Sequence, residues 1–157
     1  MKKLLPIYIF AAGLFFACGK ENAHKCCSNP PVFEEFGNAK LFIPNIFTPN
    51  ADGINDVFRP DGTNIKSMTI TIKKDGAQTF QTTKPFTEFW DATAAATGKY
   101  TFTYQAQAND GTIKNGSGEF CLVRDEAIKN CTSCAFGNQF DGNSFDSNTP
   151  NDESICD

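Results

Sequence analysis

The stretch YTFTYQAQA, residues 100–108, alternates aromatic or small apolar side chains with polar ones. Successive side chains of a β-strand point to opposite faces of the sheet, so this pattern places Tyr100, Phe102 and Tyr104 on one face. The opposite face carries threonine and glutamine. We therefore predict a strand that buries its aromatic row, and we interpret this row as core packing rather than as an exposed platform for sugars.

A second stretch, SMTITIK at residues 67–73, alternates in the same way. Asp75-Gly76 and Asp110-Gly111 follow the two stretches, and Asp-Gly favours a hairpin turn because glycine accepts a positive φ. Further strands are expected at residues 41–47, 57–59, 77–82, 86–90 and 118–123. About seven short strands without a helical period predict an all-β fold, an immunoglobulin-like antiparallel β-sandwich over residues 39–124.

The first 17 residues combine two lysines with an apolar run and are typical of a secretory signal peptide. Cys18 follows directly, as in the lipobox of bacterial lipoproteins. We expect cleavage to leave Cys18 at the N-terminus with acyl chains, each buried methylene of which contributes about 0.8 kcal/mol to membrane attachment. The alternative is an ordinary signal peptide cut nearby. With lipidation, residues 18–38 form the acylated tether of an outer-membrane lipoprotein. The sequence does not determine whether the protein lies on the surface or the periplasmic face of that membrane.

Six cysteines remain when Cys18 is set aside: Cys26, Cys27, Cys121, Cys131, Cys134 and Cys156. An even number in an exported chain predicts structural disulfides, and the sequence leaves their connectivity open. Cys121 alternates with Phe120 and Leu122, so it should point away from the core face. We expect Cys121 to bond a cysteine of the tether or of the acidic tail at residues 125–157.

Cys131-Thr132-Ser133-Cys134 is a C-x-x-C motif, which also occurs in redox and zinc sites. A redox motif belongs at the start of a helix in a βαβ unit, and no such pattern surrounds this one. A zinc site needs a second spaced pair, whereas Cys26 and Cys27 are adjacent. Structural disulfides are therefore our preferred interpretation.

The charge of the chain argues against nucleic acid as a partner. Without Lys2 and Lys3 the chain carries 12 basic against 18 acidic residues, a net charge of −6. Such a surface repels phosphate backbones, and no basic cluster interrupts it. The one histidine, His24, lies in the tether, so Ser-His-Asp and Cys-His mechanisms lack a candidate base. We expect a protein that is not an enzyme and has no catalytic residues.

Two polar segments are candidates for calcium, which takes about six to eight oxygen ligands. The first is NADGIND at residues 50–56, where the glycine is fourth and no glutamate stands twelfth, unlike an EF-hand. A turn whose Asx side chains bond the local backbone accounts for the same residues and is preferred. The second lies in the tail, in an approximate repeat of FDGNS and FDSNT. The candidate ligands are Asn50, Asp52, Asn55, Asp56, Asp141, Asn143, Asp146 and Asn148.

Several motifs resemble one known family. IPNIFTPNADGINDVF at residues 43–58 resembles the opening of the gliding-motility-associated C-terminal domain of Bacteroidota, the type B sorting domain of type IX secretion. Trp90-Asp91-Ala92 is similar to its Trp-Asp-Gly, residues 97–102 to its Gly-x-Tyr-x-Tyr strand, and residues 118–124 to its closing strand. The resemblance implies an immunoglobulin-like fold in a Bacteroidota cell envelope.

These observations lead to one expected function and two alternatives. We expect a non-catalytic envelope lipoprotein that attaches to the membrane through its lipid, binds a protein partner in adhesion or assembly, and is linked to gliding motility or type IX secretion. The first alternative is a sorting-type domain recognised by the secretion apparatus. The second is a calcium- or glycan-binding surface module.

Overall fold

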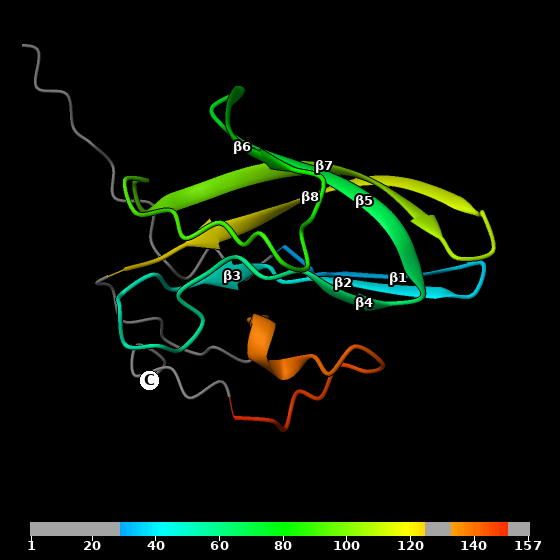
Figure 1. Cartoon of the computed structure of the whole chain (residues 1–157). Helices are drawn as coiled ribbons and strands as arrows, with labels where there is room; N and C mark the ends of the chain where they lie inside the picture. Colours follow the sequence, from blue (N-terminus) through cyan, green and yellow to red (C-terminus); the bar gives the residue numbers. More distant parts are fainter. Residues whose placement is uncertain (1–28, 125–132, 151–157) are drawn as a thin grey trace, which may run out of the picture.

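The computed structural model describes residues 29–124 and 133–150, which form a two-layer β-sandwich (Figure 1). Within these residues, a three-stranded sheet has the order β1-β2-β4: β1 (Val32–Phe36), β2 (Ala39–Ile43) and β4 (Asp61–Thr63). A five-stranded sheet has the order β3-β8-β7-β5-β6: β3 (Ile46–Phe47), β8 (Ile113–Leu122), β7 (Gly98–Ala108), β5 (Ile65–Lys74) and β6 (Ala77–Thr82). The predicted all-β sandwich is confirmed.

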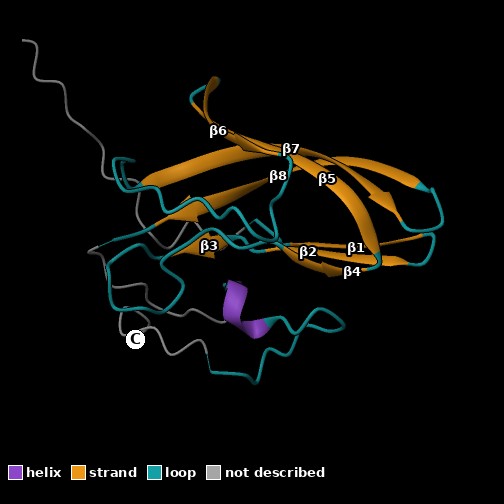
Figure 2. Ribbon diagram, viewed as in Figure 1, coloured by secondary structure: helices purple, strands orange, loops and turns teal. Residues whose placement is uncertain are grey.

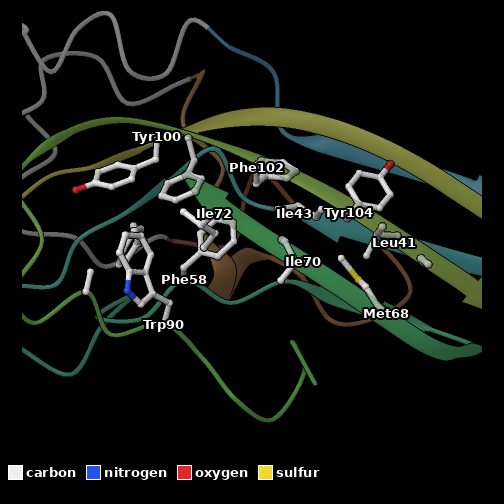
Figure 3. Close-up of a cluster of buried hydrophobic side chains, with 14 of the residues drawn as sticks. Leu41, Ile43, Phe58, Met68, Ile70, Ile72, Trp90, Tyr100, Phe102 and Tyr104 are labelled. Atoms are coloured by element: carbon white, nitrogen blue, oxygen red, sulfur yellow. The ribbon is translucent and has the colours of Figure 1, made fainter. Parts of the chain in front are cut away.

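The two alternating stretches form β5 and β7, which lie side by side in antiparallel register. Their apolar faces point into the sandwich, where Met68, Ile70 and Ile72 meet Tyr100, Phe102 and Tyr104 (Figure 3). Each of these six residues is at most 5% exposed. Trp90 and Phe120 belong to the same cluster. The aromatic row is therefore core, as the alternation predicts.

Two glycines of β8 make room for the largest core rings. Gly118 pairs with Phe102 and Gly116 pairs with Tyr104. A Cβ atom added at Gly118 would lie 2.5 Å from the Phe102 ring, and one at Gly116 would lie 2.4 Å from the Tyr104 ring. No real side chain tolerates such contacts, so the rings of β7 extend over glycines of the neighbouring strand.

Both Asp-Gly turns occur where the sequence predicts them. Asp75 and Gly76 have φ angles of 50° and 82° and join β5 to β6. Gly111 has a φ of 93°, and its N–H donates to the carbonyl of Ala108 at the β7–β8 turn. The Asp110 carboxylate accepts the N–H of Thr112 at 2.9 Å and also that of Asn38 in the β1–β2 turn. The two turns are thereby linked at one end of the sandwich.

One strand lies where we predicted tether. β1 pairs with β2 along its whole length, from Val32 opposite Ile43 to Phe36 opposite Ala39. The sandwich therefore includes residues before position 39. The strand follows two prolines and its alternation spans only five residues, so its pairing with β2, rather than any strong local pattern, identifies it.

The strand expected at residues 41–47 is divided between the two sheets. β2 ends at Ile43, and β3 begins at Ile46 in the other sheet, where it pairs in parallel with β8. Pro44 has no N–H for a ladder and so favours the break. The expected strands at residues 57–59 and 86–90 amount to one bridge, Phe58 to Trp90. β4 was not predicted, because Asp-Gly-Thr has no apolar alternation.

The described part of the tail packs on the outer side of the three-stranded sheet (Figure 2). It contains a short 3-10 helix, η3 (Gly137–Gln139), and a bridge between Phe140 and Phe145. Ala135 and Phe136 are at most 2% exposed. The tail is therefore part of the folded domain over residues 133–150.

Candidate functional site

The loop at residues 50–56 is held by its own side chains. The Asp56 carboxylate accepts the N–H groups of Ala51 and Gly53, each at 2.7 Å. The Asp52 carboxylate accepts the N–H of Ile54 at 2.8 Å and a hydrogen bond from the Asn50 side chain at 2.9 Å. These contacts are the Asx turn that the sequence analysis preferred for this loop.

The same contacts bear on the first calcium candidate. Asn50 Oδ1 accepts the N–H of Asp52, and Asn55 Oδ1 accepts the N–H of Asn138 in the tail. All four proposed ligand side chains therefore already act as backbone or side-chain hydrogen-bond partners. Among the described residues, no three His, Cys, Asp or Glu side chains come close enough to hold a metal ion. A calcium site at this loop stays the alternative to the preferred Asx turn.

The repeat in the tail has a structural explanation. Asp141 accepts the N–H groups of Asn143 and Ser144, which hold the pKa of its carboxyl below the usual value. Asp146 accepts the N–H of Asn148 at 2.8 Å in the same way. Each copy of the repeat thus makes one Asx turn, and its phenylalanine points to the sandwich. The second calcium candidate likewise stays a prediction.

Asn45 joins four segments of the chain and is fully buried. Its Nδ2 donates to the carbonyls of Asn29 at 2.7 Å and Ser133 at 3.0 Å, while its Oδ1 accepts the N–H of Ala135 at 2.7 Å. Its backbone N–H donates to the Ala135 carbonyl, and its own carbonyl accepts the N–H of Cys121 in β8. The sequence analysis did not predict this role. Its only sign in the sequence is an isolated polar residue beside Pro44.

Arg124, which follows β8, binds the carbonyl groups of two loops. Its guanidinium donates to the carbonyls of Pro49 and Ala92, and to that of Ala95 at 3.4 Å. Ala92 has a φ of 53° and stands where the resemblance places a glycine. A positive φ of this size favours glycine, because other residues place Cβ too close to the backbone. Its hydrogen bonds to the carbonyls of Pro49, Ala92 and Ala95 give Arg124 a structural role after β8.

Two of the six predicted disulfide cysteines lie in the described residues. Cys121 and Cys134 are both disulfide-bonded. Cys121 is 1% exposed, and it lies outside the main core cluster to which Phe120 and Leu122 belong. This is the orientation that strand parity predicts. The remaining predicted sites, Cys18, Cys26, Cys27, Cys131 and Cys156, lie outside the described residues.

Four phenylalanines attach the tail to the three-stranded sheet and are called here the aromatic cluster: Phe33 of β1, Phe42 of β2, and Phe140 and Phe145 of the tail. The rings of Phe42 and Phe140 stack with centroids 4.5 Å apart. Phe33 lies 5.0 Å from Phe42 and 5.2 Å, edge on, from Phe145. The cluster therefore joins sheet and tail through apolar contacts.

A groove of about 360 Å³ lies beside this cluster. Its apolar wall includes Phe33, Phe140 and Phe145, and its polar rim includes Ser144 and the ion pair of Lys40 with Glu35 at 3.5 Å. Phe33 is 48% exposed, although it belongs to a packed cluster. An aromatic side chain that is half packed and half exposed beside a polar rim is typical of an anchor point for a partner.

A second hollow, of about 400 Å³, separates the loop at residues 50–56 from the tail. Asp56, Arg59 and Asn138 contribute its polar groups. The Asp56 carboxylate is directed to the loop backbone, and the Arg59 guanidinium lies 5.7 Å above the centre of the Phe89 ring. The charged groups of this hollow are therefore committed to contacts within the chain.

Comparisons of the chain with protein-family models, curated proteins and solved structures give no match. In the part of the chain that the structure describes, no helix has the length and apolar character needed to cross a membrane.

Proposed function

We propose that this protein is a non-catalytic interaction module of the cell envelope that binds a protein partner in its aromatic groove. Lipidation of Cys18 would hold the module at the outer membrane, and the disulfide-bonded tail would keep the groove assembled. The observation that carries the proposal is the groove between β1 and the tail, in which the side chain of Phe33 is 48% exposed.

The energetics favour an apolar side chain of the partner as the occupant. Complete burial of a phenylalanine contributes about 1.5–3 kcal/mol, so covering the exposed half of Phe33 contributes about 1 kcal/mol. Phe145 is half buried in the same groove and adds to this area. Glu35, Lys40 and Ser144 can pair with polar groups around the anchor, as at the rim of many interfaces.

A site-specific cross-link tests this proposal. A photo-reactive phenylalanine analogue at position 33 should give one defined adduct with an envelope protein in irradiated cells. The same analogue at Gln78, an exposed residue of β6, is the matched control and should not give that adduct.

The purified partner then measures the contribution of the groove. It should bind the Phe33→Ala variant about fivefold more weakly than wild type, as expected for the loss of about 1 kcal/mol, and should bind Gln78→Ala unchanged. Equal adducts at both positions, or unchanged binding by Phe33→Ala, would contradict the proposed groove.

A second candidate is the sorting-type domain of type IX secretion. It is favoured by the positive φ of Ala92, because the resemblance places a glycine at this position. Deletion of the secretion apparatus separates the two functions. A lipoprotein exported by the general route should still reach the outer membrane, whereas a cargo of the apparatus should accumulate in the periplasm.

A further inference from the structure

β1 is an edge strand of the three-stranded sheet, because β2 is its one neighbour among the described strands. A two-residue turn joins the two strands, and Phe36 pairs with Ala39 across it. The closing pair of such a hairpin exchanges both backbone hydrogen bonds, and pairs that do and do not exchange them alternate from there along the strand. The backbone N–H and C=O groups of Phe33 and Glu35 therefore point away from β2, to the free edge.

The other edges of the two sheets are less suited to a further strand. β4 has three residues, and β3 has two. The register of β6 with β5 is irregular between Ile72 and Lys73, and a bulge of this kind twists an edge and disrupts added pairing. β1, in contrast, pairs with β2 without a register shift over all five of its residues. It is therefore the longest regular free edge among the described strands.

Open space borders β1 both toward the tail and toward β8. The groove beside the aromatic cluster lies on the tail side, where Phe33 is 48% exposed. A further hollow, of about 330 Å³, lies between residues 30–34 and residues 117–119 of β8. Gly118 lines this hollow without filling it, because it has no side chain. Successive side chains of a strand added to β1 would point to these two sides in turn.

The free backbone groups determine which kind of partner fits this edge. Phe33 and Glu35 each present one donor and one acceptor, and these two sets are about 6.8 Å apart, as for alternate residues of any strand. An extended peptide carries the same groups at the same spacing, whereas a helix bonds its backbone groups internally. From this match and the space on both sides, we propose that the partner adds an extended segment to β1 as a further strand of the sheet. This inference rests on the proposed function, because it names what enters the groove.

Charge favours a segment of another protein over a second copy of β1. Two copies of this strand paired in antiparallel fashion about its centre would place Glu34 opposite its counterpart and Glu35 diagonally across. Like charges that lie opposite each other destabilise a pair of strands, and charged residues at an edge commonly prevent self-pairing. The segment that fits therefore has an apolar side chain beside Phe33 and no acidic residue beside the two glutamates.

Hydrogen exchange of the purified chain, followed residue by residue by NMR, tests the edge itself. The amides of Glu34 and Phe36 donate to β2 in this register, whereas those of Phe33 and Glu35 do not. We expect the latter two to have protection factors at least about tenfold lower, as for groups open to solvent. Equal protection of all four amides would mean that the edge is already covered, and would overturn the inference.

A library of short random peptides displayed on phage supplies the probe for binding. Peptides enriched on the wild-type chain should have apolar residues at alternate positions. Glu35→Pro removes the outward N–H without removing a bond to β2, and an edge strand tolerates proline where the N–H faces solvent. An enriched peptide, made synthetically, should bind this variant at least about tenfold more weakly, because its carbonyl loses a donor. Glu35→Gln keeps the N–H and is the matched control, with a Kd within about twofold of wild type.

Three results of the binding experiment would overturn the inference. These are that no peptide is enriched, that Glu35→Pro keeps its melting temperature and binds as tightly as Glu35→Gln, or that the chain forms dimers which Glu35→Pro dissociates. If Glu35→Pro fails to fold, the exchange measurement decides. Phe33→Ala separates the two proposals: weaker binding by this variant alone retains the groove and removes the added strand, whereas weaker binding by Glu35→Pro alone retains the strand and removes the groove.

Discussion

Substitution of Asn45 should release the tail from the sandwich. Its side chain makes three hydrogen bonds, to Asn29, Ser133 and Ala135, in a position with no exposed surface. Each lost bond that leaves a buried partner unsatisfied costs about 1 kcal/mol or more. The bond to Ala135 is buried, whereas those to the Asn29 and Ser133 carbonyls are partly buried. We therefore expect Asn45→Ala to lower the free energy of unfolding by about 2 kcal/mol.

Asn45→Asp removes fewer bonds but changes the charge. The variant keeps the Oδ1 acceptor for Ala135 and places a carboxylate oxygen against the carbonyls of Asn29 and Ser133, where Nδ2 now donates. A buried carboxylate facing carbonyl oxygens favours its protonated form, so burial should raise its pKa. With a raised folded pKa, the variant should be most stable below the unfolded pKa and lose stability as pH rises.

Urea denaturation of both variants measures these effects. Asn115→Asp is the matched control, because Asn115 is exposed on β8, and it should change stability by less than about 0.5 kcal/mol. Limited proteolysis should cut residues 133–150 of Asn45→Ala faster than the sandwich. The reasoning is refuted if both Asn45 variants unfold within about 1 kcal/mol of wild type at pH 7, since one buried and two partly buried hydrogen bonds should together exceed this.

Four other predictions concern the loop, the core and the cysteines. Ala51→Gly should stabilise the fold by about 1 kcal/mol, because exposed Ala51 has a φ of 67° and glycine adopts it without strain; urea denaturation measures this. Burial raises the pKa of Tyr104 to about 12, so its contribution to stability is present below pH 10 and lost as pH rises toward 12; melting curves of Tyr104→Phe should depend less on pH in this window. Calcium should leave the melting temperature unchanged, because Asp52 and Asp56 already bond within their loop; a rise that a chelator reverses would contradict this. The intact mass should show acyl chains on Cys18 and should rise by about 2 Da per disulfide on reduction; an unmodified N-terminus would contradict the lipoprotein hypothesis.

Much of the sandwich could be predicted because its strands carry local signals. The alternation at residues 67–73 and 100–108 identifies β5 and β7, and Asp75-Gly76 identifies the turn that follows. Each signal comes from residues adjacent in sequence, where the two-residue period of a strand or the φ of a glycine is directly visible. Strand parity likewise predicted that Cys121 points away from the core cluster.

The surfaces now proposed for binding could not be predicted in this way. Asn45 gains its role from partners at positions 29, 133 and 135, and the groove needs Phe33 of β1 beside Phe145 of the tail. Contacts between residues so far apart in the chain leave no period in the sequence. The alternating sequence by itself determined that two sheets enclose an aromatic core, whereas the tertiary structure alone decided which polar and aromatic side chains meet outside it, because these meetings depend on strand order and register.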